Sequence, residues 1–315
     1  MKDSHIYDFR LDVDIPERID KLLSLHLPEY SRSTIQKWIR NKDILIDGKP
    51  CSQKDKIFET CDVSINVKTK PSINLIPENI DIDIVDETDD YIVVNKKSGV
   101  VTHIAPGNYS GTLQNGLYFK YPELSEVPRT GIIHRLDKDT SGLLVVCRNL
   151  ASHNYLSKQL QEKNFTKIYH ALVTRHIEKP IVVEEPIGRH PINRKKMTTH
   201  INGRCAISKI KPLTIFKNTT HVEVELITGR THQIRVHLAY LNNPVIGDSM
   251  YGFKKTFFIK DLNISETIDP VFFQYLHAYS LSFMDPSSNK LKKYTAEYPE
   301  EYSMLLNQLN KGSCD

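Results

Sequence analysis

The sequence predicts an α+β protein with a mixed, largely antiparallel sheet, preceded by a smaller unit of two helices and a hairpin. Two observations carry this prediction. From about residue 84 to the end, short apolar segments of strand length recur with helical patterns between them, but strand and helix do not alternate regularly. In the first ~65 residues, by contrast, two helical patterns come before two strand patterns.

Residues 1–70 are expected to form the smaller unit. Pro28 ends the first helical pattern, because proline disfavours helical backbone angles in the residue before it. Ser31 or Ser33 can cap the second helix. Ile44–Ile46 is predicted to be a strand that ends in an Asp47-Gly48 turn. The inward positions expected for the two helices and the return strand are Ile19, Leu22, Leu23, His26 and Leu27, then Ile35, Trp38 and Ile39, then Val63, Ile65 and Val67.

A change of composition marks the next boundary. Residues 71–90 contain seven acidic residues and no Lys or Arg, and Pro71 and Pro77 interrupt the first half. We therefore predict a linker over residues 71–84 and a second domain over residues 85–315. An acidic stretch repels phosphate, so a nucleic acid would bind elsewhere. The elements expected in the second domain include strands at Tyr91–Asn95, Leu143–Val146, Tyr169–Val173 and His221–Leu226 and a helix at Ala151–Gln161.

The composition narrows the class of protein. The 315 residues carry a formal charge of +4 with a pI of about 8.6, which permits an RNA partner without demanding one. The start of the chain lacks the pattern of a signal peptide, and no apolar run has the length of a membrane span. The five cysteines form no C-x-x-C pair, which favours a reducing, cytoplasmic setting. No metal-ligand cluster or phosphate-cradling glycine loop is present, so neither metal nor cofactor is expected.

The segment Gly131–Val146 is the first candidate for chemistry. A polar loop, His134–Gly142, leads directly into an apolar strand, and such loops are where rigid active sites are built. The alternative is an ordinary turn, in which Asp137 or Asp139 caps the backbone.

Two further segments carry polar side chains on predicted strands. Ile227–His237 places four Arg and His residues around Gln233, with Ile234 and Val236 alternating, which predicts a strand with one cationic face. A solvated edge strand is the alternative, but this density of Arg, His and Gln favours a carboxylate or polyanion site. In the third segment, Tyr169 shares a strand face with Lys167; simple packing is the alternative for this tyrosine.

These segments together resemble a known family. His134-Arg-Leu-Asp-x-x-Thr-Ser-Gly142 resembles the signature of the RluA family of RNA pseudouridine synthases, and the N-terminal unit resembles the S4 RNA-binding module. The resemblance covers nearly the whole chain. Its further segments, in family order, are Asn95–Gly99 with His103, the strand of Tyr169, Arg230–His237, Gly247–Gly252 and Leu276–Ala278.

The resemblance implies a pseudouridine-synthase catalytic domain in which Asp137 is the catalytic carboxylate. Asp137 either adds to C1′ of the ribose or removes the C2′ proton, and the sequence leaves both open. Arg235 is expected to pair with it through both prongs of the guanidinium. Tyr169 is expected to stack on the uracil and to accept the C5 proton, with Lys167 lowering its pKa.

Other residues are expected to bind the substrate. Arg135 matches the arginine that fills the space left by the extruded nucleotide, and Leu136 and Ile234 are expected to form apolar walls. His134 is expected to orient the loop. The expected partner is RNA, without a membrane or an obligate protein partner. The positions expected to contact phosphates are Arg32, Lys37, Arg40 and Lys42 on the S4 unit and Arg194 and Lys195 in the larger domain.

Within the family, Leu27–Ser33 and Pro186–Met197 are most similar to enzymes of the large ribosomal subunit, which implies 23S rRNA as substrate. The alternatives are a tRNA or another rRNA site, and a non-catalytic S4 protein of ribosome assembly. A hydrolase that uses Asp137 with a second carboxylate is a further alternative, but the surroundings of the motif are cationic rather than acidic.

Overall fold

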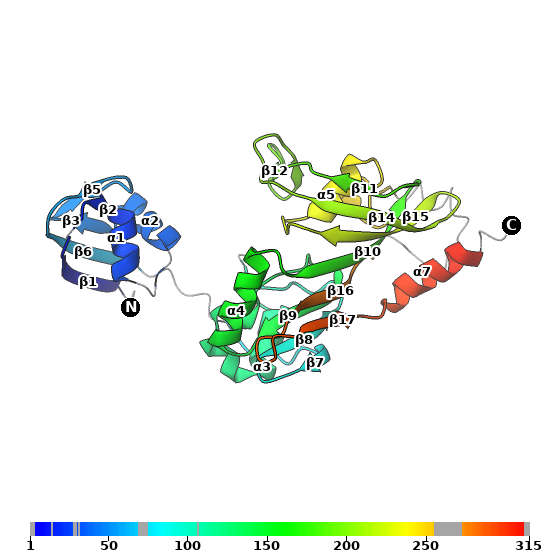
Figure 1. Ribbon diagram of the computed structural model, residues 1–315, viewed down its shortest axis with the longest axis horizontal. Helices are drawn as coiled ribbons and strands as arrows, with labels where there is room; N and C mark the ends of the chain where they lie inside the picture. The colour runs from blue at the N-terminus through cyan, green and yellow to red at the C-terminus, as the bar shows by residue number, and fades with distance from the viewer. Residues whose placement is uncertain are drawn as a thin grey trace. The chain divides into compact units, whose positions relative to one another are not determined.

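The structure is a computed structural model that describes residues 4–13, 15–27, 30, 32–68, 75–105, 107–254 and 273–311. The chain divides into two compact units, Met1–Asn74 and Leu75–Asp315 (Figure 1). Part of the segment expected to be a linker lies in the second unit. There, Ile82 packs against the core and the Glu78 amide donates to the Asn115 carbonyl at 3.2 Å.

The N-terminal unit packs two helices on a small antiparallel sheet. The helices and the return strand were predicted, but the first strand, β1, was not. Pro28 and Ser31 lie outside the described residues, while Ser33 lies inside the second helix and so is not its cap. The sheet order is β1-β6-β3-β4, and β2 pairs with β5. The bounds are β1 Ser4–Leu11, β2 Glu17–Arg18, α1 Ile19–His26, α2 Arg32–Asn41, β3 Ile44–Ile46, β4 Lys49–Pro50, β5 Lys56–Ile57 and β6 Cys61–Lys68.

The core of this unit follows most of the predicted inward positions, but His26, which was expected to face inward, is exposed. Ile19 and Leu23 of α1 and Ile35 of α2 are fully buried against the sheet, together with Ile65 of β6. Beside this core lies Asp20, whose carboxylate is fully buried and receives three side-chain donors, from Arg18, Arg32 and Gln36.

The second unit is built on a nine-stranded sheet, and most of its strand pairs are antiparallel, as predicted. β9 and β16 form a parallel pair. The order along the sheet is β11-β14-β15-β10-β16-β9-β8-β7, with β17 on β16. The bounds are β7 Asp83–Glu87, β8 Tyr91–Lys96, β9 Ser141–Cys147, β10 Thr166–Thr174, β11 Ile181–Val183, β14 Ser208–Ile215, β15 Thr219–Leu226, β16 Leu276–Met284 and β17 Leu291–Thr295.

Helices cover both faces of this sheet. On one face, α3 (Leu113–Lys120) and α5 (Gln233–Tyr240) enclose the largest apolar core. On the other face lie α4 (Leu150–Gln161) and α7 (Glu300–Lys311). A separate hairpin, β12 (Ile187–Arg189) with β13 (Met197–Thr199), extends beside α5 (Figure 1).

One predicted element is wrong. The segment Arg230–His237 was expected to be a strand, but it forms a turn followed by α5. The turn is fixed by Gln233, whose Oε1 accepts hydrogen bonds from the Arg230 amide at 3.0 Å and from the Thr228 hydroxyl at 2.8 Å. Residues 233–238 are all buried, polar side chains included, so the helix has no solvent-exposed face in this segment. Without that face the polar and apolar residues do not repeat with the period of a helix. The spacing of Ile234 and Val236, two residues apart, instead matches the pattern of a strand.

No helix in the described ranges has the length and apolar character needed to cross a membrane.

Candidate active site

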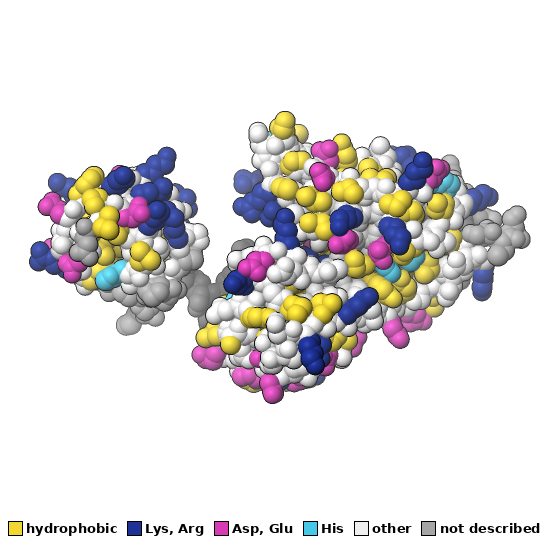
Figure 2. Space-filling model, viewed as in Figure 1, with side chains coloured by type: hydrophobic (Ala, Val, Ile, Leu, Met, Phe, Trp, Pro, Cys, Tyr) yellow, Lys and Arg dark blue, Asp and Glu magenta, His cyan; other side chains and the backbone are white. Residues whose placement is uncertain are grey.

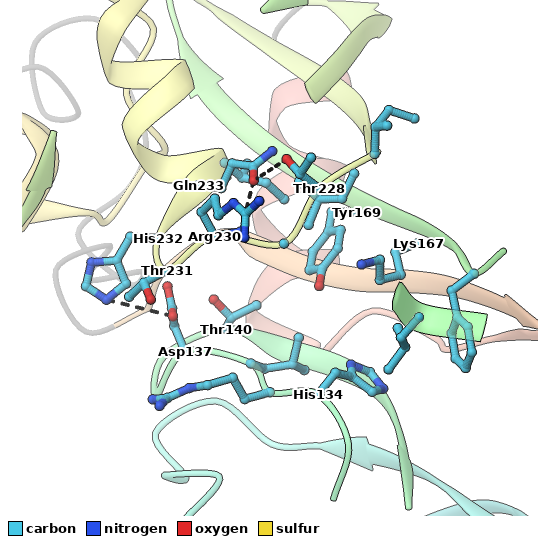
Figure 3. Close-up of a pocket in the computed structure, with 18 of the residues that line it drawn as sticks. His134, Asp137, Thr140, Lys167, Tyr169, Thr228, Arg230, Thr231, His232 and Gln233 are labelled. Carbon is cyan, nitrogen blue, oxygen red and sulfur yellow. Dashed lines mark hydrogen bonds and ion pairs between the residues drawn. The ribbon is translucent and has the colours of Figure 1, made fainter. Parts of the chain in front are cut away.

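A cavity of about 490 Å³ opens at the end of the sheet where the polar loop, the start of β10 and the turn before α5 meet (Figure 3). The three sequence segments predicted to carry chemistry therefore share one site. Its lining includes Asp137, Tyr169, Lys167, His134 and Gln233, together with cations at the rim.

The loop that carries Asp137 is held from several sides. The Thr102 hydroxyl donates to the Leu136 carbonyl at 2.8 Å, and the Lys96 ammonium donates to the Lys138 carbonyl at 3.0 Å. His134 Nε2 accepts the Val145 amide at 3.0 Å. Burial lowers the pKa of His134 to about 3, so the ring is neutral and can accept this bond. This is the geometry of a residue that orients the loop.

A glycine allows the loop to enter the sheet. Gly142, with φ +109°, lies where a Cβ would be 2.4 Å from the Ala278 carbonyl oxygen. A side chain at this position is excluded both by that contact and by the backbone conformation.

Asp137 and Arg235 contact each other across a separation of 98 residues. Arg235 Nη1 lies 3.0 Å from Asp137 Oδ2. The expected two-pronged contact is wrong for this pair, because Arg235 directs its fork at Asp248 instead, with Nε–Oδ2 at 2.6 Å and Nη2–Oδ1 at 2.9 Å. Burial alone would lower the pKa of Arg235, but the carboxylates of Asp248 and then Asp137 raise it above its usual value.

Asp248 belongs to a closed set of contacts that the sequence did not reveal. Gln274 Nε2 donates to Asp248 Oδ2 at 3.0 Å, and the Thr140 hydroxyl donates to Gln274 Oε1 at 3.2 Å. The Thr140 amide in turn donates to the Asp137 carbonyl at 3.2 Å. Asp248 and Gln274 are both buried. The signal available in the sequence was the resemblance of Gly247–Gly252 to a family segment, which gave no role.

Tyr169 lies buried in the cavity with Lys167 beside it (Figure 3). Burial, and secondarily the Asp137 carboxylate, raises the pKa of Tyr169, which is the opposite of the expected direction. Burial also lowers the pKa of Lys167. The tyrosine hydroxyl is therefore protonated at neutral pH.

His232 and Tyr251 complete the surroundings of Asp137. His232 Nε2 lies 3.8 Å from Asp137 Oδ1, and His232 Nδ1 lies 2.7 Å from the Tyr251 hydroxyl. The Arg235 guanidinium is 4.8 Å from the centre of the Tyr251 ring. The sequence placed His232 in a candidate segment without a role and did not predict Tyr251.

The remaining predicted substrate residues line the same cavity. Leu136 and Ile234 are buried, and Arg135 is exposed at the rim. Arg129 and Lys163, which the sequence did not single out, are also exposed there. The opening is thus cationic and its interior combines apolar walls with one carboxylate, an arrangement suited to a nucleotide in a polyanion.

The family model described as RNA pseudouridylate synthase matches residues 90–240, which contain Asp137, Tyr169 and Arg235. The chain belongs to this family. A second model, the S4 domain, matches residues 17–64. Both halves of the resemblance found in the sequence are confirmed.

Proteins named as synthases are similar to this chain over most of its length. A protein of Neisseria meningitidis serogroup B named ribosomal large subunit pseudouridine synthase D is 40% identical over 303 residues, which cover 93% of this chain and 78% of the relative. The protein of that name from Escherichia coli K12 is 36% identical and covers 92% of this chain and 90% of its own. The solved structure of human RNA pseudouridylate synthase domain containing 1 is 26% identical, with a TM-score of 0.54, and covers 73% of this chain and 86% of that chain.

The synthase carries its predicted phosphate-contact residues on both units. Lys37, Arg40 and Lys42 are exposed, whereas Arg32, though half-exposed, is tied to Asp20 at 2.9 Å. Arg194 and Lys195 are exposed in the turn of the β12–β13 hairpin. Figure 2 shows Lys and Arg side chains gathered on the N-terminal unit and, on the second unit, beside the hairpin.

Proposed function

We propose that this synthase isomerises specific uridines to pseudouridine in 23S rRNA of the large ribosomal subunit. The observation that carries the proposal is the contact of Asp137 Oδ2 with Arg235 Nη1, at 3.0 Å, inside a cavity with a cationic rim. The relatives named ribosomal large subunit pseudouridine synthase D support the choice of RNA. A synthase acting in ribosome assembly would work in the cytoplasm.

In this proposal Asp137 acts on the ribose. The reaction breaks the N1–C1′ bond and forms the C5–C1′ bond, so the uracil is both leaving group and returning nucleophile. A single carboxylate is enough, in contrast to the two that glycoside hydrolases use. Asp137 either adds to C1′ or removes the C2′ proton. Arg235 holds the carboxylate in place through the 3.0 Å contact of Nη1 with Asp137 Oδ2.

Tyr169 is assigned to the base. Its ring lies in the cavity, where it can stack on the extruded uracil. When the new C5–C1′ bond has formed, a proton must leave C5. Because the pKa of Tyr169 is raised, the phenol must first release its own proton to solvent; the phenolate, scarce at neutral pH but strongly basic, then takes the C5 proton and becomes a phenol again, so that the net transfer is from C5 to solvent.

The neighbouring residues bind and hold the nucleotide. Leu136 and Ile234 form the apolar walls, and Lys167 binds a polar group of the substrate inside the cavity. Arg135, at the rim, occupies the stack that the nucleotide leaves, which compensates part of an unstacking cost of about a few kcal/mol. His134 keeps the loop in place.

The two units are proposed to divide the work. The S4 domain, residues 1–70, contacts phosphates through Arg32, Lys37, Arg40 and Lys42, and the segment 71–84 connects it to the catalytic domain, 85–315. Arg194 and Lys195 add contacts from the hairpin. Phosphate contacts position an RNA without reading its sequence.

Two measurements test the proposal. Release of tritium from rRNA labelled at C5 of uridine is expected for the wild-type protein and not for Asp137→Ala; a non-catalytic assembly factor would release none in either case. Mapping pseudouridines in cells without the protein is expected to show their loss from 23S rRNA. Loss from a tRNA or from another rRNA instead would overturn the substrate assignment and keep the reaction.

A further inference from the structure

The hydrogen bonds around the Tyr251 hydroxyl define whether Tyr251 or His232 is the donor in the contact between them. The Met197 amide lies 2.8 Å from this oxygen and can only donate to it. The hydroxyl keeps one proton of its own, and the second neighbour within hydrogen-bond distance is His232 Nδ1, at 2.7 Å. No other acceptor for this proton occurs among the described residues. The proton therefore points at Nδ1, because the opposite direction would leave a half-buried hydroxyl unsatisfied.

This direction fixes the tautomer of His232. If Nδ1 accepts a proton from Tyr251, the single proton of the neutral ring is on Nε2. That nitrogen faces Asp137 Oδ1 at 3.8 Å, as the dashed line in Figure 3 marks. At this distance the two groups do not yet form a hydrogen bond.

The two oxygens of Asp137 therefore have different surroundings. Oδ2 is bound by Arg235 at 3.0 Å, while Oδ1 has the His232 ring in front of it. The backbone of His232 is in the left-handed region, with φ 56° and ψ 21°, a conformation that is strained for a residue with a Cβ. Such strain is tolerated where it aims a side chain at a functional group.

We propose that His232 is a positioning residue for the catalytic carboxylate. Its neutral Nε2–H closes onto Asp137 Oδ1 when a uridine fills the cavity, so that both oxygens are held during the reaction. A neutral imidazole N–H orients the carboxylate without giving up its proton, whereas an imidazolium could protonate it. The inference rests on the proposed role of Asp137, but the tautomer itself does not depend on it.

The tautomer is directly measurable. In the full-length protein labelled with ¹⁵N-histidine, a long-range ¹H–¹⁵N spectrum distinguishes protonated from unprotonated ring nitrogens, and the signals missing from His232→Gln identify His232. We expect Nδ1 to be unprotonated and Nε2 protonated at neutral pH. We expect Tyr251→Phe to move the ring away from this single tautomer. A protonated Nδ1 in the wild-type protein overturns the proposal.

A pair of substitutions tests the role in turnover. The amide nitrogen of Gln reaches the place of Nε2, whereas that of Asn reaches the place of Nδ1. We expect His232→Asn to lower kcat about 10- to 100-fold with little change in KM, as for the loss of one hydrogen bond to a charged group. His232→Gln should recover most of this loss.

The pair also separates positioning from a purely structural effect. Asn tolerates left-handed backbone angles better than Gln, so a role in the turn alone would favour His232→Asn. Equal losses in both variants, or a smaller loss in His232→Asn, overturn the proposal. Failure of the proposed function is a distinct result: the wild-type protein would release no tritium, or Asp137→Ala would release as much as the wild type, while the tautomer of His232 remained as inferred.

Discussion

Arg235 binds Asp248 through two nitrogens, at 2.6 and 2.9 Å, and Asp137 through one, at 3.0 Å. The stronger contact of this arginine is thus with a residue that is not among those lining the cavity. The third nitrogen, Nη1, contacts Asp137, and the two contacts with Asp248 fix the direction from which it does so. This arrangement predicts how the site responds when either carboxylate or the arginine is changed.

Replacing Asp248 should affect stability and turnover together. Asp248→Asn keeps the shape of the side chain but removes the charge that compensates a buried guanidinium. Breaking a buried pair in this way costs about 3–5 kcal/mol. We expect a loss of that order in the free energy of unfolding, measured with urea, and slower tritium release at temperatures where the variant is folded. Unchanged stability would contradict the assigned pairing.

Arg235→Lys should be far from neutral. Lysine has a single ammonium on a flexible stem and cannot contact Asp248 with two nitrogens while reaching Asp137 with a third. We expect kcat to fall by about 100-fold or more, which corresponds to ~2.7 kcal/mol of transition-state stabilisation. Single-turnover tritium release measures this. Lys293→Arg, a Lys/Arg exchange on the exposed strand β17, is the matched control and should leave the rate unchanged.

Tyr169→Phe should separate binding from turnover. The phenyl ring preserves stacking on the base, whereas the phenol oxygen that is proposed to take up the C5 proton is lost. We expect the Kd for an rRNA fragment to change by less than about 2-fold and kcat to fall by about 10²- to 10⁴-fold, the usual range for a general base. Full activity in this variant would remove the tyrosine hydroxyl from the mechanism.

The decline of kcat on the acidic side of its pH profile should reflect the protonation of His232. Burial, followed by the charges of Asp137, Arg235, Asp248 and Arg135, gives a net lowering of the His232 pKa from its usual value of 6.5. The neutral ring therefore persists below pH 6.5, and kcat should decline only at lower pH. Tyr251→Phe removes a donor that stabilises the neutral ring, so its pKa should rise and the decline should begin at higher pH. A decline that moves to lower pH would contradict the inferred hydrogen-bond direction.

Substitutions in the S4 unit should distinguish side chains that bind phosphate from side chains that also stabilise the fold. Lys37→Ala and Arg40→Ala are expected to weaken RNA binding and to lower the dependence of log K on log salt by about 0.7–0.9 for each phosphate that the variant no longer neutralises. Arg32→Ala should in addition destabilise the protein, because it removes a partner from the buried Asp20 carboxylate. Binding measured over a salt series and urea unfolding together test the three variants.

The sequence predicted the parts of the site that are local. The polar loop of Asp137 and the strand of Tyr169 lie where their patterns place them, since the loop leads directly into the buried strand β9 and Tyr169 lies within β10. Residues 230–235 line the cavity, as predicted for this segment, but its helix was not predicted, because residues 233–238 are all buried and present no exposed face with a helical period. Asp248 and Gln274 were missed for another reason. Their contacts join residues 13 to 134 positions apart in different elements, and no local pattern records these.

The parallel pairing of β9 with β16 has a consequence for how the active site can vary. Ser141 lies opposite His277 and Gly142 opposite Ala278, so the segments leading into both strands arrive at the same end of the sheet and bring Thr140 within reach of Gln274. Inserting a single residue ahead of either strand would displace one of the two by about 3.3 Å, more than a hydrogen bond can follow. Both lead-in segments should therefore resist changes of length, whereas the exposed hairpin turn at residues 190–196 is free to lengthen or shorten as the RNA target changes.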